Sequence, residues 1–154
     1  MGSPMLTPYL ALKVIHVLAA IVAVGGNVTY AFWLRRAGHD RERLLWTIEG
    51  VRRFDRAIAN PTYVVLLISG ALMVLNGPWR FDQLWIALSL GLYVFVALLG
   101  ILIYAPAVRR QLAEADRDPS SVAYATAERR STFLGLVTTS IVIVIVILMV
   151  TKPG

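Results

Sequence analysis

Residues 85–104 of the chain read WIALSLGLYVFVALLGILIY and contain no charged side chain. A helix needs about 20 mostly apolar residues to cross the roughly 30 Å hydrocarbon core of a bilayer. Residues 10–34 and 133–151 also meet this requirement, and residues 57–75 meet it if their helix begins before Pro61. The sequence therefore predicts an all-α, polytopic membrane protein. Its single membrane domain, residues 1–154, should be a bundle of four transmembrane helices.

The composition agrees with a membrane protein. Hydrophobic residues make up 58% of the chain and charged residues 16%, whereas a soluble domain has about 25% charged residues. The chain has no cysteine, which excludes disulfides, thiolate metal ligands and thiol catalysis.

Twelve of the fifteen basic residues fall in two of the three connections between the predicted spans, and the other three are Lys13, Arg80 and Lys152. Cytoplasmic loops of membrane proteins are enriched in Lys and Arg. We therefore expect a multi-pass protein of the bacterial inner (plasma) membrane with both termini outside. An orientation signal and attraction to anionic lipid account for these arginines without a nucleic-acid partner. The twelve are Arg35, Arg36, Arg41, Arg43, Arg52, Arg53, Arg56, Arg109, Arg110, Arg117, Arg129 and Arg130.

The arginine-rich connections are predicted to be helical cytoplasmic extensions of the spans. Gly38 can end the first helix in a left-handed conformation, and Asp40 can cap the next helix. Pro61 should bend that helix, because a proline ring clashes with the carbonyl four residues earlier. Apolar residues with helical spacing precede it, and they form either an interfacial amphipathic helix or an extension of the second span. These are Leu44, Leu45, Ile48, Val51, Phe54 and Ile58.

The last helix should be long and unbroken. Asp118 followed by Pro119 resembles a helix cap and a first helical position, so this helix should run from about Pro119 to Val150. Every Asp and Glu falls in a predicted loop or at a helix end, and the chain shows no Ser/His/Asp set, no paired carboxylates and no phosphate-binding loop.

One face of the first span is polar or small at every position. It is formed by residues three or four apart, which lie on the same side of a helix: Tyr9, Lys13, His16, Ala20, Ala23, Asn27 and Tyr30. The opposite face, which should contact lipid, carries Val14, Leu18, Val22 and Trp33. Two interpretations of the polar face compete. Its small residues and the hydrogen bonds of His16 and Asn27 can pack helices together, or the imidazole can ligate haem iron or relay protons.

Two methionines are further candidate ligands. Met73 and Met149 lie near the outer ends of their spans, at a depth comparable to that of His16. Each can supply an axial thioether ligand or fill gaps in the core. Lys13 can extend its ammonium group to the interface. The candidate cofactor-binding residues are therefore His16, Lys13, Asn27, Met73 and Met149, with His16 as the ligand of haem iron.

Several short motifs resemble a known family. The sequence Leu12-Lys13-x-x-His16-Val17 is similar to the first-span motif of HemJ-type protoporphyrinogen oxidases and of copper-resistance D-type membrane proteins. Residues 52–70, with Asn60-Pro61 and Ser69-Gly70, resemble the entry to their second span, and residues 143–153 resemble the HemJ C-terminus. The closer resemblance is to a bacterial integral-membrane family of unknown function in that neighbourhood.

The HemJ resemblance implies a haem-b-binding membrane oxidase, with the first-span histidine of that family matching His16. That family also carries a histidine and a lysine in its third span, whereas residues 84–93 contain neither. The resemblance thus implies haem binding through His16 but leaves the second axial ligand open.

Three classes of function remain open. The first is a haem- or porphyrin-binding redox protein. The second is a non-enzymatic structural or accessory membrane component. The third is a small transporter or channel that uses Lys13, His16 and Asn27 as a polar path. A homodimer is expected, because four helices hide few polar faces and two copies of His16 can supply two ligands.

Overall fold

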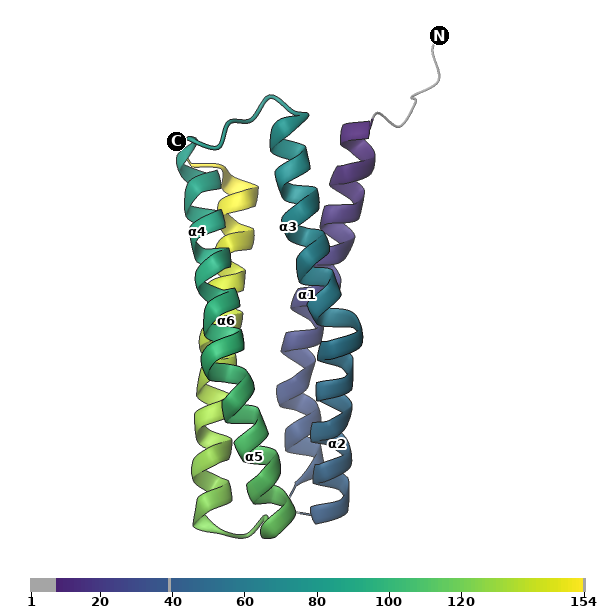
Figure 1. Ribbon diagram of the computed structural model, residues 1–154, viewed down its shortest axis with the longest axis vertical. Helices are drawn as coiled ribbons and strands as arrows, with labels where there is room; N and C mark the ends of the chain where they lie inside the picture. The colour runs from purple at the N-terminus through teal and green to yellow at the C-terminus, as the bar shows by residue number, and fades with distance from the viewer. Residues whose placement is uncertain (1–7, 39, 154) are drawn as a thin grey trace.

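The computed structural model describes residues 8–38 and 40–153, with Ala31 described by its backbone only. Its six α-helices are α1 (Pro8–Ala37), α2 (Arg41–Phe54), α3 (Asn60–Leu75), α4 (Leu84–Leu99), α5 (Ala105–Arg117) and α6 (Val122–Thr151). A π-helical turn, η1 (Asp55–Ala59), joins α2 to α3, and a second, η2 (Gly100–Tyr104), joins α4 to α5. The chain therefore runs through four continuous helical rods (Figure 1).

Each rod is long and apolar enough to cross a membrane. The four rods are Pro8–Ala37, Arg41–Leu75, Leu84–Arg117 and Val122–Thr151. This confirms the predicted four-helix membrane bundle with helical extensions. The loop between α3 and α4 and the C-terminal end of α6 lie at one end of the bundle, close to the start of α1 (Figure 1). We call this the terminal end, and the opposite end, which carries α2, α5 and the start of α6, the arginine-rich end.

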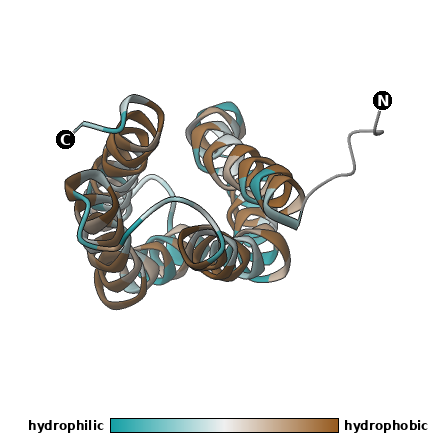
Figure 2. Ribbon diagram, turned by 90° about the horizontal axis from the view of Figure 1, so that it is seen from above, coloured by the Kyte–Doolittle hydropathy of each residue, from teal (hydrophilic) through white to brown (hydrophobic). Residues whose placement is uncertain are grey.

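The rods pack in two pairs. In the first pair α1 packs along α3 and also contacts α2, and in the second α6 packs along α4 and α5. Across the part of the chain that the structure describes, α3 and α4 do not pack along each other. The two pairs also meet, α2 with α5 and α1 with α6. Seen from above, the loop between α3 and α4 crosses from one pair to the other (Figure 2).

Aromatic side chains and a lysine link the two pairs at the terminal end. Trp79 in the connecting loop donates from Nε1 to the hydroxyl of Tyr9 on α1, at 2.9 Å. The Trp79 ring also meets Trp85 of α4 edge to face, with centroids 5.3 Å apart. Lys152, just after α6, places Nζ 4.2 Å from the centre of a Trp79 ring. Such cation–π contacts are worth about 0.5–1 kcal/mol at exposed sites.

Prolines explain the two π turns. In η1 the N–H of Asn60 bonds to the carbonyl of Asp55, five residues earlier, and Pro61 follows directly. In η2 the N–H of Ala105 bonds to the carbonyl of Gly100, and Pro106 follows in the same way. The extra residue in each turn accommodates the proline without breaking the helix. The predicted bend at Pro61 is confirmed: it takes the form of this widened turn, where the ribbon changes direction (Figure 1).

The ends of the helices follow the sequence signals with one exception. Gly38 adopts the left-handed conformation, with φ 63°, and the Asp40 side chain accepts the N–H of Arg43 as a helix cap. The last helix is unbroken as predicted, but it starts at Val122 rather than at Pro119. Ser121 is its cap, and Asp118 instead accepts the N–H of Ser120 in the preceding turn.

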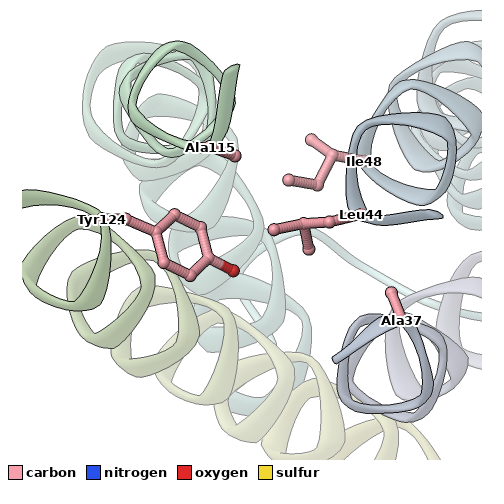
Figure 3. Close-up of a cluster of buried hydrophobic side chains, with 5 residues drawn as sticks. All are labelled: Ala37, Leu44, Ile48, Ala115 and Tyr124. Carbon is pink, nitrogen blue, oxygen red and sulfur yellow. The ribbon is translucent and has the colours of Figure 1, made fainter. Parts of the chain in front are cut away.

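A compact apolar cluster closes the arginine-rich end. It joins α1, α2, α5 and α6 through Ala37, Leu44, Ile48, Ala115 and Tyr124, whose side chains converge between the helices (Figure 3). Leu44 and Ile48 are each only 1% exposed. The α2 helix is therefore a packed extension of the second span, continuous with α3, and not a separate helix on the membrane surface.

Candidate functional site

The polar face of α1 meets the rod formed by α2, η1 and α3. Three hydrogen-bonded pairs follow each other along this contact, and we call these six residues the polar seam: His16 with Ser69, Asn27 with Tyr63, and Tyr30 with Asp55. Ala23, which lies between the first two pairs on α1, is 2% exposed. The face predicted from spacing is thus the face that packs against another span. The opposite residues, Val14, Leu18, Val22 and Trp33, are exposed on the outside of the bundle.

The first pair defines the state of the imidazole. The Nδ1 atom of His16 lies 2.9 Å from Ser69 Oγ, and that oxygen lies 2.6 Å from the carbonyl of Val65 one turn earlier on α3. With the single hydroxyl proton directed at this carbonyl, Ser69 Oγ is assigned as the acceptor of a hydrogen bond from Nδ1–H. The neutral ring then carries its hydrogen on Nδ1 and its lone pair on Nε2.

A glycine allows this close approach. A Cβ atom on Gly70 would lie 3.2 Å from Cε1 and 3.6 Å from Nδ1 of His16. The imidazole ring therefore packs directly against the backbone of α3 at Gly70. Ser69 is 3% exposed, so both groups of this pair are positioned by helix packing.

The middle of the seam connects three helices. Asn27 donates from Nδ2 to the hydroxyl of Tyr63, at 2.7 Å. Tyr93 of α4 donates its hydroxyl to the backbone carbonyl of Tyr63, also at 2.7 Å. This second bond connects α3 to α4, although the two helices do not pack along each other.

The third pair contains a residue that the sequence interpretation missed. Asp55 was expected in a loop or at a helix end, yet it lies inside the continuous rod Arg41–Leu75 and accepts a hydrogen bond from the Tyr30 hydroxyl. It is the first residue of the π turn η1, and such turns are frequent at functional sites. One signal in the sequence was available: Asp55 precedes Tyr63 by eight residues, a spacing that repeats one face of a helix.

The ring of Phe54, the residue before Asp55, covers one side of the Tyr30–Asp55 pair. Phe54 meets Tyr30 edge to face, with ring centroids 6.1 Å apart. A Cβ on Gly26 would lie 2.9 Å from the Phe54 ring, so this glycine allows the ring to lie against α1. The Tyr30–Asp55 pair is thereby enclosed on one side by an aromatic wall.

A family model described as "Predicted integral membrane protein (DUF2269)" matches residues 10–153. The chain belongs to this family. No curated protein and no solved structure matches the chain. The family description names no activity, so the resemblance to HemJ-type and copper-resistance D-type proteins stays a prediction. The family match and the four rods together establish the all-helical fold and the membrane class.

The other candidate ligands differ in their helix and in their exposure. Met73 is half-buried one turn beyond Ser69, on the α3 face that meets α1. Lys13 lies one turn before His16 on α1, but its side chain is exposed. Met149 is half-buried on α6, which packs on α4 and α5. Among residues 8–38 and 40–153, no three His, Cys, Asp or Glu side chains gather in a way that could hold a metal ion.

Proposed function

We propose that this membrane protein binds haem b or a related porphyrin through Nε2 of His16 and serves as a small redox protein. The observation that supports the proposal is the bond from His16 Nδ1 to Ser69. Histidines that ligate metals usually donate their other ring N–H to a protein acceptor, which orients the ring and makes the ligating nitrogen more basic. Ser69, itself bonded to the Val65 carbonyl, is such an acceptor.

The porphyrin would bring one-electron chemistry, and the chain would supply the ligand and its surroundings. Met73 would be a further residue able to hold the group, because it lies on the same α3 face as Ser69. Lys13 and Met149 are the remaining candidates within the chain. A homodimer offers another arrangement, in which His16 of a second copy supplies the second ligand.

An absorption spectrum of the protein purified in detergent, before and after addition of haemin, tests the proposal. We expect a Soret band in the wild type and its loss in His16→Ala. Val17→Ala, at an exposed neighbouring position, is the matched control and should keep the band. A band that survives in His16→Ala would reject His16 as ligand and direct the test to Met73, Lys13 and Met149. Wild-type protein without a band would reject haem binding, and the non-enzymatic structural or accessory role would then account for the seam.

A second candidate function rests on Asp55. The sequence suggested a polar path through Lys13, His16 and Asn27, as in a small transporter or channel. It predicted no acidic residue on that path. The Tyr30–Asp55 pair adds a carboxylate to the same seam, and ionisable residues inside spans often mark ion or proton pathways. Proton flux into proteoliposomes that is lost in Asp55→Asn but kept in Asp116→Asn would support this function. No flux above that of protein-free vesicles would reject it.

We also propose an orientation of the protein in the membrane. We infer from the twelve arginines at or near one end of the bundle that this end faces the cytoplasm of a bacterium and that both termini are outside, because cytoplasmic loops are enriched in Lys and Arg. A reporter that works only in the cytoplasm should be inactive when fused after Gly154. An active reporter at that position would reverse the orientation.

A further inference from the structure

The outer side of α1 and α2 carries a groove at the arginine-rich end. It has a volume of about 240 Å³ and lies between α1 and α2. Its walls are aromatic: Tyr30 and Trp33 come from α1, and Trp46 and Phe54 from α2. Gly50 lines it as well, and the space around a Cβ at that position is open.

Trp46 is the most unusual member of the groove. Its side chain is 77% exposed on a helix whose other outward residues are mostly charged. Tryptophan in such a position is typical of the membrane–water interface, where its ring is amphipathic. Burial in the core of the protein does not explain it.

The level of the groove relative to the membrane follows from helix length. Counting about 20 residues back from Leu75 for roughly 30 Å of hydrocarbon reaches about Asp55. Residues 46–54 therefore lie in the adjoining headgroup layer. An occupant of the groove at this level meets the polar part of a lipid rather than its acyl chains.

Two arginines lie beside the groove. Arg36 follows Trp33 by three residues on α1, and Arg43 precedes Trp46 by three residues on α2, so each shares a helix face with one of the aromatic walls. Both are exposed, and among residues 8–38 and 40–153 neither side chain has a hydrogen bond or an ion pair. Arginine binds phosphate groups through a planar set of N–H donors.

From this placement we propose that the groove of Tyr30, Trp33, Trp46, Gly50 and Phe54 binds the headgroup of an anionic phospholipid. The indole walls contact the glycerol and headgroup atoms, and Arg36 and Arg43 bind the phosphate. The groove shares Tyr30 with the polar seam, where its hydroxyl is bonded to Asp55. Its proposed ligand and its test are different from those of the seam.

Native mass spectrometry of the full chain in detergent, with added phosphatidylglycerol or phosphatidylcholine of the same acyl chains, tests the proposal. We expect the wild type to retain phosphatidylglycerol preferentially. Replacing Arg36 and Arg43 by Gln should lower this retention about fivefold for each arginine. The control replaces Arg129 and Arg130 of α6 by Gln, which removes the same charge elsewhere and should leave retention unchanged.

A second pair of variants tests the shape of the groove. Gly50→Leu fills it and should abolish the preference for phosphatidylglycerol. Gly91→Leu places the same side chain at another helical glycine with open space around its Cβ and should behave like the wild type. Circular dichroism verifies that each variant is folded, and if Gly50→Leu does not fold, the arginine variants decide. Equal retention of the two lipids by the wild type, or an equal loss in the two arginine double variants, would overturn the proposal.

Discussion

The two ends of the bundle are held together in different ways. At the arginine-rich end four helices bury an apolar cluster around Leu44, Ile48 and Tyr124, as the core of a soluble protein does. A buried hydrogen bond from Ser131 to Gln111, at 2.6 Å, adds to it. Toward the terminal end many large apolar side chains point outward, although Trp85, Ile86 and Ile145 are buried. There α1 meets α3 through small residues and the His16–Ser69 bond.

The difference reflects the two solvents. In water, burying apolar surface stabilises by about 25 cal/mol per Å², so the extensions gain from a compact core. Lipid tails are as apolar as leucine, so this driving force is absent inside the membrane, and close backbone approach and hydrogen bonds take its place. The mode of packing thus changes along the bundle, and in the second and third rods the π turns η1 and η2 lie between the two regions.

Truncating the apolar cluster should have the largest effect on stability. We expect Leu44→Ala to lower the free energy of unfolding by about 2–5 kcal/mol, because it leaves a cavity in a packed core. Leu136→Ala, at a position that is 60% exposed on α6, should change it by less than about 0.5 kcal/mol. Denaturation followed by circular dichroism measures both. Equal effects would mean that the two ends are packed alike.

Breaking the polar seam should have a smaller effect. His16→Ala removes the bond to Ser69 and should lower the free energy of unfolding by about 1 kcal/mol, the usual size for a hydrogen bond between membrane helices. Val17→Ala, on the exposed side of the same helix, serves as control in the same denaturation experiment. A loss as large as that of Leu44→Ala would contradict the distinction between the two ends.

Alanine substitutions at two glycines in the membrane half should have different effects on stability. At Gly70 a methyl group would lie 3.2 Å from the His16 ring, so Gly70→Ala should destabilise the protein and displace the imidazole. At Gly91 nothing lies near a Cβ, so Gly91→Ala should be neutral or stabilise by up to about 1 kcal/mol through helix propensity. Thermal unfolding distinguishes the two. The same sign at both positions would show that the close contact with His16 has no energetic importance.

The smallest effect is expected in the loop at the arginine-rich end. The hydroxyl and the backbone N–H of Ser120 bond to the Asp118 carboxylate and hold its pKa below the ordinary value. A lowered pKa in the folded state stabilises the fold above the pKa of the unfolded chain, and this contribution is lost as the pH falls through the folded pKa. The unfolding temperature of Asp118→Asn should therefore be slightly below that of the wild type at pH 7. The difference should shrink as the pH is lowered through and below the ordinary carboxyl pKa of about 4.

Ser120→Ala is the partner variant in the loop. It removes the hydroxyl but keeps the backbone N–H, so it should reduce the pH-dependent difference without abolishing it. A difference that is constant with pH would show that the charge of Asp118 does not contribute.

Much of the architecture follows from the sequence alone. The four apolar runs predicted the four rods, because the length of apolar sequence has to match the thickness of the bilayer. Local signals placed Gly38, Asp40 and the bend at Pro61, since each depends on the conformation of a few neighbouring residues. The spacing of His16, Ala23 and Asn27 predicted which face of α1 is inside, because helical periodicity is itself local.

Only the tertiary structure decided which residues those faces meet. The partners Ser69, Tyr63 and Asp55 come from a rod whose rotation depends on the extra residue in η1, and hydrophobic periodicity does not reveal that turn. For the same reason Asp55 was placed at a helix end rather than in the polar seam. The hydrogen bond between His16 Nδ1 and Ser69 also requires two helices in register. Contacts between distant segments are set by packing, and the pattern of one segment does not contain them.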